Sequence, residues 1–155
     1  MRGRSLELKI PPPVVTLLIA VVMWLVYRAV PSLTFVLPAH GLLVIILVVA
    51  GFVTSISGVV TFRHARTTVN PTQPALSSSL VTWGIYAITR NPMYLGLLMI
   101  LSGWAIFLSN ALAFLFLPVF VLYINRYQIK PEERTLTGLF GEDYVAYQRR
   151  VRRWI

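Results

Sequence analysis

The chain has 155 residues, of which 57% are hydrophobic and only 12% are charged. A soluble domain carries about 25% charged residues, so this composition excludes an ordinary soluble domain and indicates a membrane protein. The net charge of +9 does not indicate a nucleic-acid-binding protein, because the basic residues stand at the ends of apolar runs. The absence of cysteine excludes disulfides and thiolate chemistry, and two histidines in different segments make a metal site improbable.

Four apolar runs predict four transmembrane helices, over residues 14–30, 42–62, 93–108 and 111–127. The first run follows a basic N-terminus, but it is long for a signal peptide and no small-x-small cleavage site follows it. We therefore expect a retained helix rather than a cleaved signal. The last two runs are near the lower limit for crossing about 30 Å of hydrocarbon, so local thinning of the bilayer is expected.

The connections between the runs predict the topology. Ser109-Asn110 is too short for anything but a tight antiparallel hairpin. The N-terminus, the polar loop 63–91 and the C-terminal part of the chain from Arg126 onward hold 13 of the 14 Lys and Arg residues. Because cytoplasmic loops are enriched in basic residues, we expect a multi-pass protein of the cell membrane with both termini cytoplasmic.

The C-terminal segment, residues 131–155, has apolar residues at helical spacing. These are Leu136, Phe140, Tyr144, Tyr147, Val151 and Trp154. The pattern predicts an amphipathic cytoplasmic helix, interrupted at Gly141, whose basic end can lie on anionic headgroups. The predicted fold class is thus an all-α integral membrane protein, with about four transmembrane helices and this segment, in a single domain over residues 1–155.

Three polar clusters fall on the predicted cytoplasmic side: the loop 67–81, the turn 86–94, and residues 126–133. The hairpin brings residues 92 and 130 close together, so a pocket at the membrane interface is expected. Each cluster also has a purely structural reading. Asn91-Pro92 is a typical helix start, and Glu132-Glu133 suit the first turn of a helix. Tyr86 and Tyr94 can belong to an interfacial aromatic belt.

Two motifs carry a resemblance. The first reads Gly84-x-Tyr86-x3-Arg90-Asn-Pro-x-Tyr94-x-Gly96. The second follows about 36 residues later and reads Glu132-Glu133-x2-Leu136-x3-Phe140-Gly-x2-Tyr144-x2-Tyr147-x3-Val151-x-Arg153-Trp154. Together they resemble the isoprenylcysteine carboxyl methyltransferase family, whose relatives include the phospholipid N-methyltransferases. The likeness covers roughly residues 60–155, and the first two runs match only in being apolar.

The resemblance implies an integral membrane enzyme that uses S-adenosylmethionine. Carried over by position, the cofactor contacts are Ser78, Ser79, Leu80, Val81, Tyr86, Asn91, Pro92, Met93, Tyr94 and Glu132. The family often has His where this chain has Asn91, which argues against a general base there. Candidate catalytic residues are Arg90 and Glu133, and candidate substrate contacts are Arg126 and Gln128. Prenylcysteine enzymes have Arg at the position of Gln128, so carboxyl methylation is in doubt unless Arg126 or Arg134 substitutes.

Methyl transfer needs in-line positioning and exclusion of water, and a cationic cofactor suits aromatic faces and a carboxylate. An amine substrate would need a base, for which Glu133 is the candidate, whereas a carboxylate would need none. The sequence predicts methylation of a lipophilic molecule entering from the bilayer, at either oxygen or nitrogen. The alternatives are a non-catalytic scaffold or lipid-binding module and, less favoured, a nicotinamide-dependent membrane reductase. No Gly-x-Gly-x-x-Gly motif occurs, which excludes a soluble Rossmann-type cofactor domain. The sequence does not indicate the oligomeric state.

Overall fold

The computed structural model describes residues 7–38, 40–65 and 79–155. Every regular element in these residues is helical. In chain order they are α1 (Pro12–Ala29), η1 (Pro31–Leu33), α2 (His40–His64), η3 (Gly84–Ala87), α3 (Pro92–Leu108), α4 (Ala111–Phe114), α5 (Phe116–Ile124), η4 (Asn125–Ile129) and α6 (Lys130–Arg150). The four apolar runs thus become helices close to their predicted bounds. The all-α fold is confirmed for the described residues.

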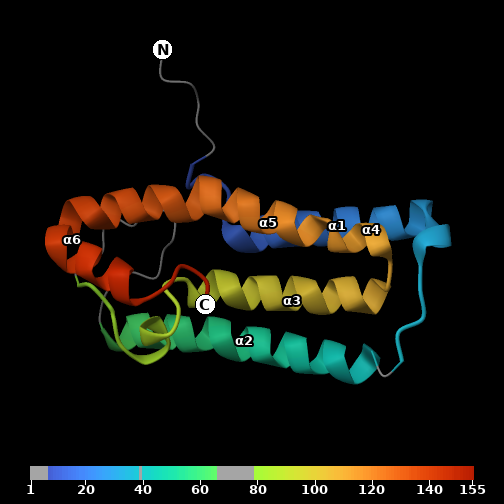
Figure 1. The fold of residues 1–155 in the computed structure, drawn as a ribbon, viewed down its shortest axis with the longest axis horizontal. Helices are drawn as coiled ribbons and strands as arrows, with labels where there is room; N and C mark the ends of the chain where they lie inside the picture. The colour runs from blue at the N-terminus through green and yellow to red at the C-terminus, as the bar shows by residue number, and fades with distance from the viewer. Residues whose placement is uncertain (1–6, 39, 66–78) are drawn as a thin grey trace, which may run out of the picture.

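The long helices pack side by side, with α3 between α2 on one face and the pair α1 and α5 on the other (Figure 1). The buried core lies between α1, α3 and α5, around Met23, Leu101, Phe120 and Ile124. Large apolar side chains on the outer faces of α1 and α2 are exposed. A wide apolar outer surface of this kind is what a helix shows to lipid.

Three described helical runs are long and apolar enough to cross a membrane: Pro12–Ala29, His40–His64 and the continuous run Ala111–Arg150. Helix α3 is equally apolar but has only 17 residues. The last run has 40 residues, about 60 Å of helix and twice the thickness of the hydrocarbon, so only its first part can lie within lipid. The count of four spans stays a prediction.

The hairpin between α3 and α4 is present. Ser109 adopts a left-handed conformation with φ of 46°, which ends α3. Asn110 is fully buried, and its Oδ1 accepts from the backbone N–H of Leu112 and so caps α4. Its Nδ2 donates to the carbonyl of Val30 at 2.9 Å, which attaches the turn to the end of α1.

The fourth run does not end before the C-terminal segment, in contrast to the separate elements that the sequence suggests. Helix α5 continues into α6 through η4, a π-helical turn (Figure 1). Pro131 lacks the N–H that would bond the carbonyl of Tyr127, but the backbone N–H of Leu8 donates to that carbonyl at 3.0 Å. The wider π turn and this outside donor together allow a proline within the helix.

Gly141 interrupts α6, as predicted. Its φ of 52° and ψ of −128° are not helical, and the chain reverses there (Figure 1). The second part of α6 returns toward α3, where Tyr144, Tyr147 and Val151 form a second buried cluster with Leu80. The C-terminal tail, residues 151–155, then lies beside the start of α3 (Figure 1).

Glycines set the spacing between α2 and α3. A side chain on Gly51 would approach the carbonyl oxygen of Gly96 to 2.6 Å, and one on Gly96 would overlap Ser55 and the carbonyl of Gly51. Small residues allow helix backbones to approach closely in this way. The hydroxyl of Ser55 also donates to the carbonyl of Met93, in the first turn of α3.

We predict that Gly96→Ala destabilises the protein by about 1–3 kcal/mol, because the added methyl forces α2 and α3 apart. Thermal unfolding in one detergent measures the effect. Gly41→Ala is the matched control, because a methyl group added at Gly41 of α2 would meet no other atom within 4 Å, and alanine favours a helix. Equal melting temperatures for the two variants would contradict the close packing of α2 against α3 at Gly96.

Candidate functional site

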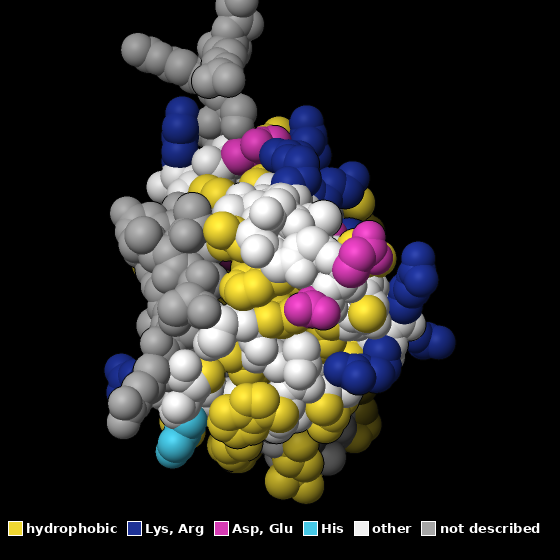
Figure 2. Space-filling view, turned by 90° about the vertical axis from the view of Figure 1, so that its left-hand side faces the viewer, with side chains coloured by type: hydrophobic (Ala, Val, Ile, Leu, Met, Phe, Trp, Pro, Cys, Tyr) yellow, Lys and Arg dark blue, Asp and Glu magenta, His cyan; other side chains and the backbone are white. Residues whose placement is uncertain are grey.

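The two sequence motifs meet at one end of the helix bundle. The phenolic hydroxyl of Tyr94, in the first turn of α3, donates to Oε1 of Glu132 in α6 at 2.5 Å. Tyr94 is 4% exposed, so the contact lies inside the protein. This end carries Lys, Arg, Asp and Glu side chains around apolar groups (Figure 2). The two motifs therefore place Tyr94 and Glu132 side by side at this end of the bundle.

Glu132 lies beyond the apolar part of its helix, and burial raises the pKa of its carboxyl to about 8. The neighbouring charge of Glu133 raises this pKa further, and the hydrogen bond from Tyr94 lowers it. The carboxyl is therefore mostly protonated at neutral pH in the ligand-free protein. A nearby cation would favour its charged form.

Tyr86 stands next to this pair. Its ring packs edge-on against Phe62 of α2 with 4.9 Å between ring centroids, and its backbone carbonyl accepts from the hydroxyl of Tyr147 at 2.7 Å. Its own hydroxyl is buried and has no hydrogen-bond partner within the described residues. Burial raises the pKa of Tyr86, with smaller contributions from Tyr147 and Glu132, so the phenol stays neutral.

Glu133 points to a different set of partners. Its carboxylate receives Nε and Nη2 of Arg153 at 3.1 and 2.7 Å, and Nη1 of Arg90 lies 3.1 Å from it. The hydrogen bonds to Glu133 raise the pKa of Arg153. The Arg90 side chain is 10% exposed, and its Nε and Nη1 are buried without a hydrogen-bond acceptor of good geometry in the described part of the chain. Arg90 therefore has donor capacity left.

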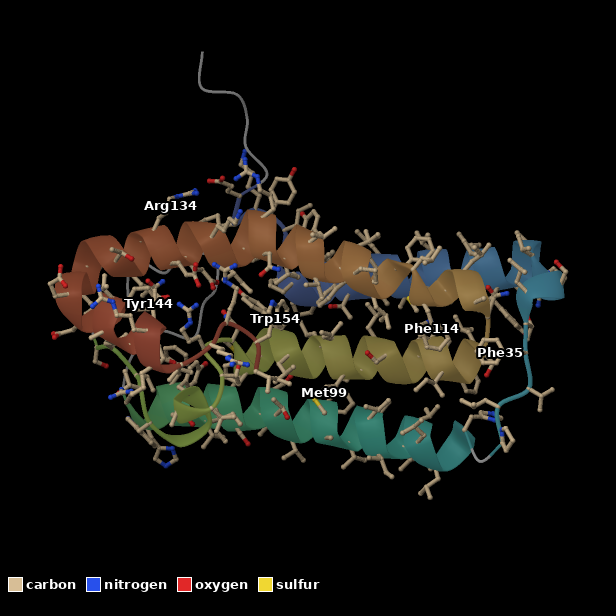
Figure 3. All side chains as sticks on the ribbon, in the orientation of Figure 1. Phe35, Met99, Phe114, Arg134, Tyr144 and Trp154 are labelled. Carbon is tan, nitrogen blue, oxygen red and sulfur yellow. The ribbon has the colours of Figure 1, made fainter. Side chains whose placement is uncertain are left out.

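The start of α3 contacts the C-terminal tail. Helix α3 begins at Pro92 as expected, but the Asn91 side chain does not cap it. Nδ2 of Asn91 instead donates to the carbonyl of Arg153 at 2.8 Å, and the backbone N–H of Arg90 donates to that of Arg152. Trp154 lies between α3 and the α5–α6 junction and donates to Oδ1 of Asn125 (Figure 3).

The two candidate substrate contacts lie apart. Arg126 is 59% exposed, lies 3.6 Å from the carboxylate of Glu7, and faces outward. Arg134 also binds Glu7 and lies on the outer side of α6 (Figure 3). Gln128 is fully buried, and its Nε2 donates to the carbonyl of Ile10 at 2.8 Å. Its Oε1 is buried with no partner among the described residues.

The remaining predicted cofactor contacts lie around Tyr144 and Tyr147 and where α2 packs against α3. Leu80 packs on Tyr144 and Tyr147, and Val81 is buried. Ser79 donates to the carbonyl of Ala65 at 3.4 Å, and Met93 lies against α2 near Gly58. Ser78 lies outside the described residues.

Sequence reasoning gave no site role to Tyr147 or Arg153. Both were assigned to the surface pattern of the C-terminal helix, Tyr147 to its apolar face and Arg153 to its basic end. Their partners are a backbone carbonyl and a carboxylate that lie far away in sequence. The scarcity of acids could have indicated Arg153: the chain has five Asp and Glu residues and fourteen Lys and Arg residues, so each acid is a candidate partner for more than one basic residue.

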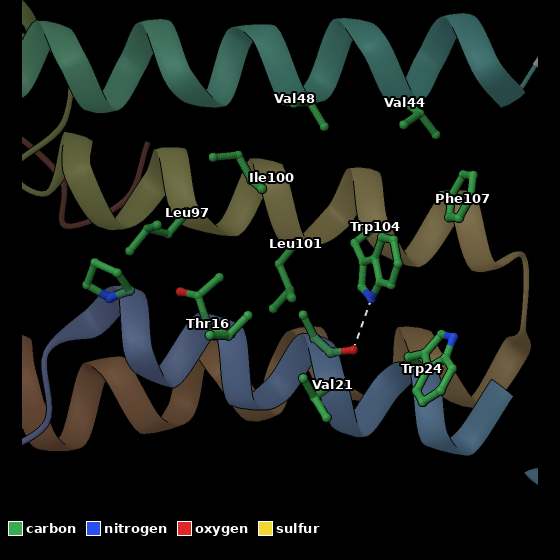
Figure 4. Close-up of a pocket in the computed structure, with 13 residues that line it drawn as sticks. Thr16, Val21, Trp24, Val44, Val48, Leu97, Ile100, Leu101, Trp104 and Phe107 are labelled. Atoms are coloured by element: carbon green, nitrogen blue, oxygen red, sulfur yellow. Dashed lines mark hydrogen bonds between the residues drawn. The ribbon is translucent and has the colours of Figure 1, made fainter. Parts of the chain in front are cut away.

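An apolar groove of about 730 Å³ runs along α3 between α1 and α2 (Figure 4). Leu97, Leu101 and Trp104 of α3 form its floor. The indole N–H of Trp104 donates to the carbonyl of Ala20, and the hydroxyl of Thr16 donates to that of Pro12. Because the polar groups of these two lining residues are satisfied within the protein, the groove suits a hydrocarbon chain.

The sequence matches the model of a family described as "Phospholipid methyltransferase" over residues 39–143, more than half of the chain. It is 48% identical over 63 residues to an uncharacterized protein of Haemophilus influenzae, covering 41% of this chain and all of that one. It is 38% identical over 72 residues to the protein-S-isoprenylcysteine O-methyltransferase B of Arabidopsis thaliana, covering 46% and 36% of the two chains. With the protein-S-isoprenylcysteine O-methyltransferase of Saccharomyces cerevisiae it shares 29% identity over 109 residues, 68% of this chain and 44% of that one. The chain thus spans less than half of these two methyltransferases.

We predict that Glu133→Gln destabilises the protein by about 1–3 kcal/mol, because it leaves buried Arg90 without its counter-charge. The C-terminal tail should also become more accessible to carboxypeptidase, because Arg153 loses the carboxylate that it binds. Glu142→Gln, at an exposed position of the same helix, is the control and should change neither. An unchanged digestion rate in Glu133→Gln would show that the ion cluster does not hold the tail.

Proposed function

The chain belongs to the phospholipid methyltransferase family, and from this premise we propose that it is a membrane methyltransferase that transfers a methyl group from S-adenosylmethionine to a lipophilic molecule. The observation that carries the proposal is the Tyr94–Glu132 contact, which joins two residues 38 positions apart beside polar groups that have no hydrogen-bond partner among the described residues. Membership of the family confirms the resemblance drawn from those motifs. The substrate and the activity of the whole protein belong to the proposal.

The polar groups at this end fit the cofactor. A sulfonium cation suits the carboxylate of Glu132 and the rings of Tyr86 and Tyr94. The buried Nε of Arg90 has no acceptor within the described residues, and with Nη1, which is ion-paired to Glu133, it suits the carboxylate of the cofactor's amino-acid part. The Tyr86 hydroxyl, equally unpartnered there, is available to a ribose or base. When bound, the cofactor supplies an electrophilic methyl group.

The residues then act by positioning and by excluding water. The hydrogen bond from Tyr94 orients the carboxylate of Glu132, and Arg153 binds Glu133, which keeps the C-terminal tail against the start of α3. Glu133 was the sequence-based candidate for a general base. In the structure its carboxylate binds Arg90 and Arg153, so we assign it, with Arg90, to holding the site together.

We further propose the four-span topology with both termini cytoplasmic, in a single domain over residues 1–155. Helices α1, α2, α3 and the run of α4 and α5 cross the bilayer, and α6 lies at the cytoplasmic interface. Figure 2 supports this arrangement, because charged side chains gather at the end where α6 reverses. The groove along α3 opens within the apolar part, which would let a substrate enter from the bilayer.

The first test is a ligand titration. We expect S-adenosylmethionine and S-adenosylhomocysteine to raise the melting temperature of the detergent-purified protein, because a ligand that binds only the folded state stabilises it. NADPH should have no effect. A response to NADPH alone would favour a reductase, and no response to any of the three would favour a scaffold or lipid-binding module.

The second test uses the pKa of Glu132. If its carboxylate binds the sulfonium, the affinity for S-adenosylmethionine rises with pH up to about 8 and falls by up to about tenfold per unit below it. Glu132→Gln should bind weakly at all pH values, measured by calorimetry. A variant with wild-type affinity would remove Glu132 from the site.

The ligand-free protein should show the opposite trend in stability. Since the folded-state pKa of about 8 lies above the ordinary value of 4.5, the stabilising contribution of protonated Glu132 is full below pH 4.5 and is lost as pH rises through 8. Glu132→Gln cannot ionise and should lose less stability over this range. Melting temperatures of the wild type and of Glu132→Gln, measured across this pH range, give the contribution of Glu132 as the difference between their pH dependences.

A further inference from the structure

Arg28 stands in the last turn of α1, at the end of the bundle opposite α6 (Figure 1). It is the one Lys or Arg among the described residues at this end. We propose that Arg28 and the adjacent end of the apolar groove bind a phospholipid of the leaflet opposite to the one at Glu132. The guanidinium binds the phosphate, and one acyl chain enters the groove beside Trp24. This goes beyond the proposed function, because the lipid is not the methyl acceptor and its site is remote from Glu132.

The acids of the chain lie too far away to neutralise Arg28. The five Asp and Glu residues all precede α1 or belong to α6: Glu7, Glu132, Glu133, Glu142 and Asp143. About 24 Å of helix separates Arg28 from the start of α1, near which Glu7 lies. The Arg28 side chain is exposed, and the ion pairs of the described residues do not include it. Its counter-ion therefore comes from outside the described chain.

Trp24 connects Arg28 to the groove. Cζ of Arg28 lies 5.8 Å from the centroid of the Trp24 ring, within the range of a cation–π contact. Trp24 in turn lines the groove, together with Trp104 and Phe107 of α3 (Figure 4). Tryptophan is enriched where the hydrocarbon of a bilayer meets the headgroups. The contact therefore places the guanidinium at headgroup depth, at one end of the apolar groove.

The groove has the length and the lining for an acyl chain of this leaflet. Its floor on α3 runs from Leu97 to Phe107, a rise of about 15 Å, which is half of the roughly 30 Å of hydrocarbon. Phe107 is the last residue but one of α3, so the groove extends inward from the end at Arg28. Val44 and Val48, in the first part of α2, form the wall there. The opposite end, at Leu97, stays available to a substrate.

The chemistry of the site selects a phosphate. A guanidinium binds phosphate through two parallel hydrogen bonds, and arginine is the preferred residue for this contact. The N-terminus of α2, at His40, lies at the same end of the bundle (Figure 1), and the dipole of that helix also favours an anion. A phospholipid has a phosphate at headgroup depth and an acyl chain directly below it. A diacylglycerol has only the chains, so it lacks the group that Arg28 binds.

The test compares a phosphatidic acid with a diacylglycerol that carries the same photoreactive, diazirine-bearing chain. The protein is purified in dodecyl maltoside, a detergent without phosphate, and labelled peptides are mapped by mass spectrometry. We expect the phosphatidic acid to label the groove at Val44, Trp104 or Phe107 about tenfold more than the diacylglycerol, because of the charge-assisted bond. Glycerol 3-phosphate, which has no chains, should not displace it. Equal labelling by both lipids would overturn the proposal and leave Arg28 only as the charged end of α1.

Variants test the two halves of the site separately. Arg28→Gln should abolish the preference for phosphatidic acid, whereas Arg149→Gln, which removes the same charge from an exposed position of α6, should keep it. Val21→Trp should reduce labelling by either lipid, because Val21 lines the groove and the larger ring fills it. Val22→Trp is the matched control, since Val22 is similarly exposed but does not line the groove.

An unchanged preference for phosphatidic acid in Arg28→Gln would overturn the phosphate contact. Equal labelling of Val21→Trp and the wild type would overturn the place of the chain. If a variant does not fold, the comparison of the two lipids on the wild type decides. These measurements need no S-adenosylmethionine, so their failure would leave the proposed methyltransferase function untouched, and a missing response to that cofactor would not affect the lipid site.

Discussion

The hydrogen bond between Tyr94 and Glu132 joins two segments that only the hairpin can bring together. Tyr94 stands in the first turn of α3, and Glu132 follows the junction of α5 and α6. Their meeting requires α3 and α5 to run antiparallel from one tight turn, which Ser109 and buried Asn110 provide at the other end of the bundle. A change of register along α3 would separate the two side chains. The close packing of α2 against α3 at Gly51 and Gly96, and the bond from Asn110 to Val30 at the far end of the bundle, therefore also fix the polar site.

Both described ends of the chain stabilise the junction at which Glu132 stands. Pro131 leaves the carbonyl of Tyr127 without its helical donor, and the segment before α1 supplies one from Leu8. The same segment fixes the amide of Gln128 through Ile10. On the other side, the C-terminal tail contacts the start of α3 and Asn125 through backbone carbonyls and Trp154. A π turn is rare within an α-helix, and these outside contacts explain how the junction keeps one geometry.

The sequence predicts the parts of this structure that repeat or that must obey helix geometry. Apolar runs located the helices, the two-residue connection predicted the hairpin, and Gly141 indicated the interruption of α6, although not that the chain reverses there. The meeting of Tyr94 with Glu132 followed from the hairpin alone. The contacts of the tail did not follow, because Asn91 bonds a backbone carbonyl at Arg153, and any residue type offers that acceptor. The continuity of α5 with α6 was also missed, since proline normally marks a helix start and its missing donor is replaced by Leu8 from far away.

The adjacent acids Glu132 and Glu133 divide two roles that one carboxylate could not fill. Successive helical residues point about 100° apart, so one carboxylate faces Tyr94 while the other faces Arg90 and Arg153. A carboxylate that binds a cationic cofactor must not already be neutralised by arginine, or its attraction would be largely lost. Among the described residues, Glu133 takes both nearby guanidinium groups and leaves Glu132 with a neutral phenol as its partner. A buried Glu132 carboxylate without a cation destabilises the folded protein, and a positively charged ligand removes this destabilisation when it binds.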